Sequence, residues 1–306
     1  MPSITQLGQV STSVLASFLV ATPLVLSTNI APAQAHDTHN HADETEYYIG
    51  IDGLRFFTSG TYAGLENPNY NRLTLLFAHR EEDSTTNHFH GIGTYSYSGT
   101  LDNLSINSTN ANNRIPERYT GQLPLQLMPG EGVFSGRLIS TATEAEYSNL
   151  KIEPVTSLAS ATDEDDQYLF NSSGGRWQSS LNGATIGLQL TSISTGLNIA
   201  DATGGNIFDS VGDTYTIGSG NSFNFKPTFW TDKAATPGTY SATFKLVDLS
   251  ANGDRTPLLE SGTFSFDFRV EQVPEPSTTV SLGLVGLLGF GLSRLKKKVG
   301  SVDLGR

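Results

Sequence analysis

The sequence predicts an all-β protein, folded as an antiparallel β-sandwich or a barrel-like structure. Apolar and polar residues alternate with a period of two in many short segments, which are joined by polar, glycine-rich stretches. After residue 35, no long segment repeats apolar residues at helical spacing. Many short strands with such connections are typical of sandwiches and barrels.

The chain starts with a predicted signal peptide over residues 1–35. This segment has no charged side chain, contains an apolar run from Val14 to Leu26, and ends in Ala33-Gln34-Ala35, a small-x-small cleavage pattern. Cleavage after Ala35 makes His36 the first residue of the exported protein. We expect residues 36–46 to form a flexible tail rich in histidine and acidic residues.

Charge limits the partners of this protein. Between the leader and the C-terminal segment roughly 240 residues remain, enough for one large or two small all-β domains. Residues 36–276 contain 13 Lys and Arg against 29 Asp and Glu, a net charge of about −16, because five of the chain's 18 basic residues and one of its 30 acidic residues lie later. We expect no nucleic acid partner, since phosphate binding needs a basic surface, whereas cations suit this charge.

Several kinds of chemistry are excluded. Cysteine is absent, so the chain has no disulfide and no cysteine nucleophile, and a zinc site must use nitrogen and oxygen ligands. No other nucleophile motif, phosphate loop or dinucleotide fingerprint is present. Trp177 and Trp230 are candidates for a sugar-stacking platform, but core packing explains most aromatic residues on alternating strands.

The clearest predicted strands are two late segments. In Tyr240–Leu246 every second residue is apolar, and Phe264–Val270 repeats this pattern. Residues 251–254, Ala-Asn-Gly-Asp, favour a turn between them, so we expect an antiparallel pair. The other predicted strands are Tyr47–Leu54, Arg72–His79, Ile92–Tyr97, Val133–Ile139, Leu150–Val155, Thr185–Thr191, Thr214–Ile217 and Phe223–Trp230.

The predicted β domain spans residues 47–272, and a boundary inside it is expected near residues 159–175. There the acidic run Asp163–Asp166 and the glycine-containing segment Ser172–Gly175 interrupt the strand pattern. An oxygen-rich loop can bind calcium, but this run lacks the spacing and the glycine of a known calcium loop, which favours a solvated linker.

The histidines are the most informative residues of the sequence. All six lie between residues 36 and 90, and none follows. A neutral imidazole is the commonest transition-metal ligand, and short spacings between histidines build chelates. The candidate metal ligands are His36, His39 and His41 in the tail and His79, His88 and His90 in the β domain. The leading hypothesis is a zinc site with copper as the alternative metal; ordinary solvent-facing histidines are the other interpretation.

His88 and His90 have the spacing of two ligands on one strand. Residues two apart point to the same face, roughly 6.5–7 Å apart at Cα, so two imidazoles there can converge on one ion. If His79 lies opposite His88 on a paired strand, all three side chains share one face and leave a fourth coordination position open. A shift of one residue removes His79 from the set.

The two strands give opposite indications about which face is buried. Phe89 lies on the face opposite His88 and His90, which places these histidines outside. His79 shares its parity with Leu75 and Phe77, which places it inside. We expect only one of these faces to be core, and His79 to be a strand-end residue turned toward the rim.

The C-terminal segment, residues 273–306, has three parts in a characteristic order. Val273-Pro274-Glu275-Pro276-Ser277 is followed by a glycine-rich apolar helix, expected over residues 280–292, and then by Arg294, Lys296, Lys297 and Lys298. This order resembles the PEP-CTERM sorting signal, which implies processing by an exosortase-type sorting enzyme and delivery to the cell surface, the outer membrane or the outside. A transient or retained membrane anchor is the other interpretation of the helix.

A second resemblance rests on four segments: Ala35-His36-Asp37-Thr38-His39-Asn40-His41-Ala42, Tyr47-Tyr48-Ile49-Gly50-Ile51-Asp52, Leu73-Thr74-Leu75-Leu76-Phe77-Ala78-His79 and Asn87-His88-Phe89-His90-Gly91-Ile92-Gly93. In these segments the chain is similar to a cyanobacterial PEP-CTERM family that is repressed by the zinc uptake regulator. The resemblance implies expression under zinc limitation. It implies no known reaction.

These observations favour an exported, surface-associated protein that captures, stores or hands over zinc under zinc limitation, with a zinc uptake system as a candidate receiver. The first alternative is a structural surface or matrix protein with incidental histidines. The second is a copper- or zinc-dependent enzyme, since an N-terminal histidine that binds copper through its amine and ring is the arrangement of oxidative polysaccharide-cleaving enzymes. We expect no catalysis, because no general base is identifiable.

Overall fold

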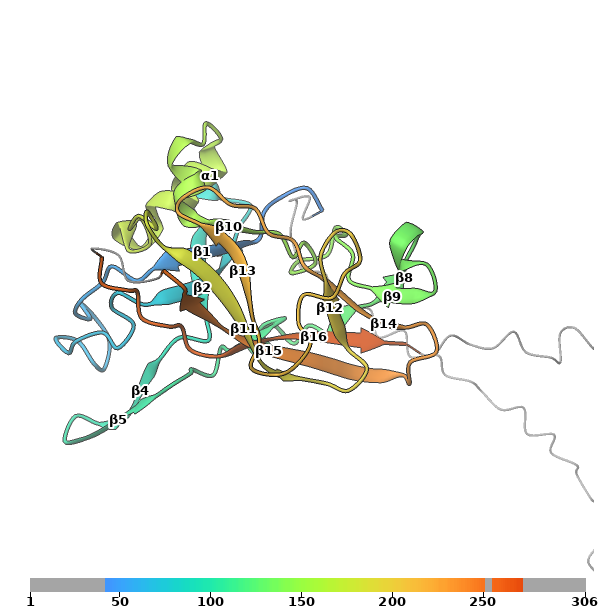
Figure 1. Ribbon diagram of the computed structural model, residues 1–306. Coiled ribbons are helices and arrows are strands. Elements are labelled where there is room, and N and C mark those ends of the chain that lie inside the picture. Colours follow the sequence, from blue (N-terminus) through green and yellow to red (C-terminus); the bar gives the residue numbers. More distant parts are fainter. Residues whose placement is uncertain (1–41, 251–254, 272–306) are drawn as a thin grey trace, which may run out of the picture. The chain divides into compact units, whose positions relative to one another are not determined.

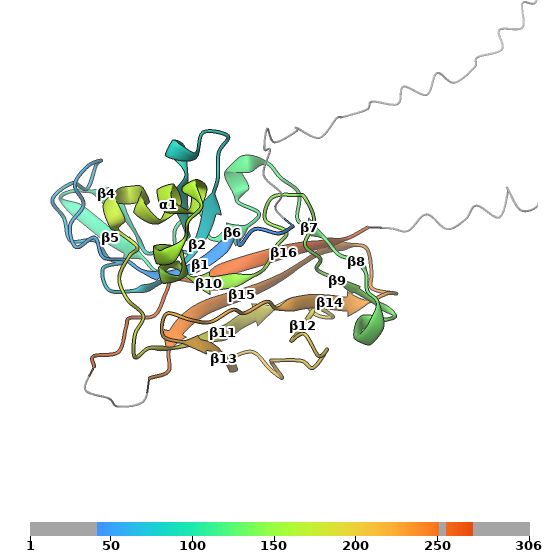
Figure 2. The ribbon, with the colours of Figure 1, turned by 90° about the horizontal axis from the view of Figure 1, so that it is seen from above.

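The all-β prediction is confirmed. The computed structural model describes residues 42–250 and 255–271, in which short strands form three sheets and a separate hairpin (Figures 1 and 2). The predicted signal peptide, the tail up to His41, the predicted turn at residues 251–254 and the C-terminal segment lie outside the described residues.

The first sheet carries three of the candidate ligands. Its strand order is β10-β1-β2-β3. β1 pairs antiparallel with β2, and β2 pairs antiparallel with β3, whereas β10 runs parallel to β1. The bounds are Tyr47–Ile51 for β1, Leu73–His79 for β2, His88–Ile92 for β3 and Ile152–Pro154 for β10.

The predicted late pair of strands lies at the centre of the second sheet and is confirmed. β15 pairs antiparallel with β16, with Tyr240 opposite Phe268. The order of this sheet is β13-β11-β15-β16-β6, and β7 also pairs with β16. The bounds are Arg114–Ile115 for β6, Leu125–Gln126 for β7, Thr185–Ile193 for β11, Thr214–Ser219 for β13, Gly238–Asp248 for β15 and Phe264–Val270 for β16.

The remaining strands form a third sheet, in the order β12-β14-β9-β8, and the hairpin of β4 and β5. Their bounds are Ser96–Thr100 for β4, Asn103–Asn107 for β5, Met128–Pro129 for β8, Arg137–Ile139 for β9, Asn198–Ala200 for β12 and Thr228–Asp232 for β14.

One hydrophobic core joins the three sheets. Its buried rings include Phe77 from β2, Phe229 from β14, Phe244 from β15 and Phe266 from β16. The ring centroid of Phe229 lies 5.6 Å from that of Phe266 and 6.1 Å from that of Phe244. Burying one such side chain contributes about 1.5–3 kcal/mol. This cluster stabilises a fold that has no disulfide.

A second core covers the other face of the first sheet. Its members are Tyr48, Leu76, Ala78 and Phe89 from the strands and Val155, Leu158, Leu169 and Trp177 from the helical segment. Figure 1 shows helix α1 (Glu164–Asn171) on the side of β1 and β2 away from β15. β2 is therefore buried on both faces from Leu73 to Ala78. The expectation that only one face is core was wrong, because residues 155–177 cover the second face.

Helix α1 was not expected from the sequence. The Asp163 side chain accepts hydrogen bonds from the N–H groups of Asp165 and Asp166, and acidic residues in the first turn suit the positive end of the helix dipole. The acidic run is thus the start of a helix and not a solvated linker. Only Leu169 of α1 is buried, so the helix has no apolar stripe that sequence analysis could detect. The domain boundary near residues 159–175 stays a prediction.

Several predicted strands have other limits in the structure, and for two of them the local backbone gives the reason. The predicted strand Ile92–Tyr97 was wrong, since β3 ends at Ile92 and β4 begins at Ser96. Gly93 has a φ of +68°, and a Cβ there would lie 2.4 Å from the Thr263 carbonyl oxygen, so only glycine fits this turn. The predicted strand Val133–Ile139 is shortened to β9, because Gly132–Phe134 form the 3₁₀ helix η3.

Candidate metal centre

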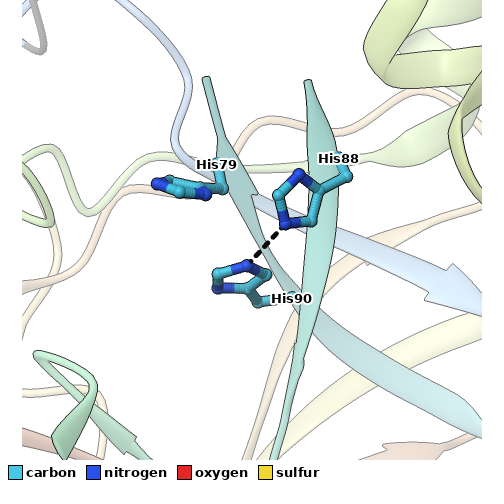
Figure 3. Close-up of side chains that lie close together, drawn as sticks. All are labelled: His79, His88 and His90. Atoms are coloured by element: carbon cyan, nitrogen blue, oxygen red, sulfur yellow. Dashed lines mark hydrogen bonds between the residues drawn. The ribbon is translucent and has the colours of Figure 1, made fainter. Parts of the chain in front are cut away.

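Three of the six predicted ligands lie together at one end of the first sheet. His79, the last residue of β2, lies opposite His88, the first residue of β3. His79, His88 and His90 each have one ring nitrogen within 4.8 Å of those of the other two. Figure 3 shows the three rings gathered on the same side of the strands. This is the register that the three-histidine set requires.

The connection between β2 and β3 fixes this register. Asp83 caps the short 3₁₀ helix η1 (Ser84–Thr86) by accepting a hydrogen bond from the N–H of Thr85. The buried Asn87 accepts a hydrogen bond of 2.8 Å from the N–H of Glu81. These bonds tie the two ends of the loop together, so His88 is held opposite His79.

His88 presents its Nε2 atom to the other rings. Its Nδ1 atom lies 2.9 Å from the carbonyl oxygen of Thr86. A carbonyl oxygen only accepts hydrogen bonds, so Nδ1 carries the hydrogen in this contact. In the neutral ring, Nε2 of His88 is then left with a free lone pair.

His90 is held in the same tautomer by a buried carboxylate. Its Nδ1 atom lies 2.8 Å from Oε2 and 3.1 Å from Oε1 of Glu117. Burial acts to raise the pKa of Glu117, but hydrogen bonds from His90, Asn112 and Tyr147 lower it below its ordinary value. The ionised carboxylate accepts the Nδ1 hydrogen and leaves Nε2 of His90 with a lone pair.

Two lone pairs therefore face each other. The Nε2 atoms of His88 and His90 are 2.9 Å apart, as the dashed line in Figure 3 marks. Because both Nδ1 hydrogens are donated elsewhere, this contact is repulsive unless a proton or a metal ion lies between the nitrogens. Tetrahedral zinc, with Zn–N bonds of about 2.0–2.1 Å, separates two ligand nitrogens by roughly 3.3 Å. To hold the ion, the rings of His88 and His90 would need to move apart by only about half an ångström.

His79 supplies the third ring. Its side chain is 29% exposed, and its Nε2 atom lies 3.5 Å from Oε1 of Glu81. Its Nδ1 atom is buried and has no hydrogen-bond partner in the part of the chain that the structure describes, and a bound cation can satisfy such an atom. Burial and the neighbouring His90 lower the pKa of His79, which favours the neutral, metal-binding form.

The predicted tail ligands His36, His39 and His41 lie outside the described residues. The chain that follows them runs beside the end of β2. The N–H of Ala78 donates to the carbonyl of Glu46, and the side chain of Arg80 donates to the carbonyl of Thr45. His41 precedes Thr45 by four residues, which span at most about 14 Å.

Sequence analysis missed Glu117 and Thr86. Glu117 follows β6, a two-residue strand that pairs in parallel with β16. No sequence pattern indicates this pairing, so nothing in the sequence places Glu117 beside His90. Thr86 contributes its backbone carbonyl, which any residue type provides.

Part of the acidic run lines a cavity of about 490 Å³, which also includes Arg80 and Lys151. The buried guanidinium of Arg80 lies 2.8 Å from Asp166, and the ammonium of Lys151 lies 2.6 Å from Glu153. These ion pairs offset part of the negative charge within the protein itself. Asp166 of the acidic run and Glu153 thus have cation partners already.

The comparison with protein-family models settles the nature of the C-terminal segment. Residues 272–297 match the PEP-CTERM protein-sorting motif. The chain carries a PEP-CTERM sorting signal. The PEP-CTERM motif supports export, recognition by an exosortase-type sorting enzyme and targeting to the cell surface. Searches of curated proteins and of solved structures found no match to this chain.

Membrane anchoring by the PEP-CTERM segment stays a prediction. Residues 42–250 and 255–271 contain no helix that is long and apolar enough to cross a membrane. The predicted apolar helix at residues 280–292 lies outside these ranges, within the matched motif.

Proposed function

We propose that this exported, surface-associated protein binds zinc between His79, His88 and His90 and captures, stores or hands over the ion when zinc is scarce. The observation that carries the proposal is the 2.9 Å contact between the Nε2 atoms of His88 and His90. Each Nδ1 atom already has an acceptor, so the two neutral rings need a shared cation.

The donor set favours zinc. Imidazole nitrogens suit zinc and copper, whereas calcium and magnesium take oxygen ligands. Copper(II) generally binds nitrogen sites more tightly than zinc, so copper is the alternative metal. Which of the two metals occupies the site then depends on their availability. The resemblance to a family repressed by the zinc uptake regulator supports zinc as the ion in use.

The centre suits metal exchange. Three protein ligands leave a fourth coordination position open, whereas a structural zinc site closes with four. The rim is accessible, since the side chains of His79 and His90 are 29% and 17% exposed. Such a site fits capture of zinc outside the cell and transfer to a receiving partner, such as a zinc uptake system.

Isothermal titration of the purified, metal-free protein with zinc tests this function. We expect a dissociation constant of about 1 µM or tighter, because three preformed imidazoles converge on the ion. The matched control is the double variant Asp163→Asn with Asp165→Asn, which neutralises acidic residues of the cavity and leaves the histidines intact. It should bind zinc as the wild type does. Absence of zinc binding by the wild type contradicts the proposal and favours a structural surface protein with incidental histidines.

The tail histidines test whether the two histidine groups form one site or two. Thr45 runs beside the end of β2, and the four residues from His41 to Thr45 are short enough to act as a tether, so we expect the tail histidines to raise zinc affinity at this site. Replacing His36, His39 and His41 by Ala should therefore lower zinc affinity about 10-fold while the number of bound ions stays the same. A drop of one in that number, with the remaining affinity unchanged, would show a separate tail site instead.

A further inference from the structure

We infer that Glu117 is the positioning residue of this metal centre: it selects the ligand atom of His90, and the bound ion balances its buried charge. The inference rests on the proposed zinc-binding function. Glu117 reaches the ion only through His90, with its Oε2 atom 2.8 Å from Nδ1 of that ring.

Among residues 42–250 and 255–271, no Lys or Arg forms an ion pair with the buried carboxylate of Glu117. Its side chain is 0% exposed, and the ion-pair partner recorded for it in the described part of the chain is His90, whose charge depends on protonation. Its other contacts are neutral, since the Asn112 amide and the hydroxyls of Tyr119 and Tyr147 donate to it. Burying an unpaired charge is costly, and a metal ion on the far nitrogen of His90 supplies the missing positive charge.

The core holds this carboxylate in place. The Tyr147 hydroxyl donates to Oε2 of Glu117 at 2.9 Å, and the Tyr147 ring stacks on Phe77 with centroids 4.3 Å apart. Phe77 lies opposite His90 in the β2–β3 ladder. The N–H of Tyr147 is fixed in turn by the Glu46 carboxylate at 2.9 Å. The same packed residues therefore position the carboxylate and the imidazole.

A carboxylate at this place has two effects on metal binding. It accepts the Nδ1 hydrogen, so the neutral ring of His90 offers Nε2, the atom that faces His88. It also raises the basicity of that nitrogen. Loss of an outer partner of this kind typically weakens metal binding about 10- to 100-fold.

Replacing Glu117 by Gln tests the inference. The amide keeps the shape of the side chain, but it is neutral and can turn either its oxygen or its NH₂ group toward Nδ1. We expect zinc affinity to fall about 10- to 100-fold and the rise in unfolding temperature caused by saturating zinc to become smaller. The matched control is Asp248→Asn, which neutralises another buried carboxylate whose partners are Arg255, Ser250 and Leu258. Its zinc affinity should equal that of the wild type.

Nitrogen-15 NMR of the His90 ring gives a readout that a merely structural role of Glu117 would not move. In metal-free wild-type protein at about pH 8, where free histidine is neutral, we expect Nδ1 of His90 to carry a hydrogen. Glu117→Gln should mix the two tautomers. An unchanged tautomer with unchanged zinc affinity in the folded variant overturns the inference, while zinc binding by the wild type leaves the proposed function intact. If the variant does not fold, a His90 ring without a hydrogen on Nδ1 in the wild type overturns it equally.

Discussion

Replacing His88 and His90 together by Ala should lower zinc affinity at least about 1000-fold, which corresponds to about 4 kcal/mol of binding free energy. The double variant removes two of the three ring nitrogens and with them the 2.9 Å contact between lone pairs. His79 alone is a single imidazole, which competes poorly with water for the ion. Isothermal titration of the metal-free variant with zinc measures the loss.

The fold should survive this change. Both side chains are partly exposed, and neither belongs to a hydrophobic core. The double variant leaves the buried carboxylate of Glu117 without its histidine partner, so the unfolding temperature of the metal-free variant should fall. His79→Ala, which removes one ligand and keeps that contact, should give an intermediate zinc affinity. Wild-type affinity in the double variant would place the ion elsewhere and remove the strand histidines from the site.

Replacing Phe229 by Ala should destabilise the protein by about 3–5 kcal/mol, the largest effect on folding that we expect. Phe229 is 1% exposed, and its ring centroid lies 4.5 Å from that of Phe268 and 5.6 Å from that of Phe266. It thus joins β14 of the third sheet to β16 of the second. The loss combines buried apolar surface with a cavity that paired strands cannot collapse to fill. Denaturant unfolding measures the free energy.

Phe229→Leu is the control for shape, because it keeps most of the apolar volume and should cost only about 1 kcal/mol. Zinc affinity of the folded Ala variant should match that of the wild type, since the ring contacts of Phe229 are Phe244, Phe266 and Phe268. A negligible loss of stability would show that the second and third sheets do not share one core.

Alternation predicts strands well where one face of the strand meets water. β15 shows this: Ala242, Phe244 and Leu246 are buried, their neighbours are partly exposed, and the strand pairs with β16 as expected. β2 lies between two cores, and its residues are buried from Leu73 to Ala78. The alternation of side chains between the two faces of β2 then no longer distinguishes buried from exposed residues, because that distinction requires one face to be exposed to solvent.

The three histidine ligands of the centre lie close together in the sequence, whereas the carboxylate that positions His90 lies far from them. His79, His88 and His90 lie within twelve residues, so strand spacing and one loop suffice to predict that they meet. Glu117 reaches His90 through contacts between distant segments: β6 pairs in parallel with β16, and the N–H of Gly93 donates to the carbonyl of Asn112. Such a contact between distant segments leaves no periodic signal. This is why the sequence predicts the candidate metal ligands but not the carboxylate behind them.

The hairpin of β2 and β3 has a consequence for the time course of export. All three rings belong to this one hairpin, and short hairpins close within about 1–10 µs at little entropic cost. If the chain crosses the membrane with its N-terminus first, His79, His88 and His90 emerge before Glu117 and Tyr147. On the proposed function, the newly exported hairpin then binds zinc weakly, and its zinc affinity rises once the later strands pack against it. On this proposal, zinc takes part in the folding of the protein that carries it.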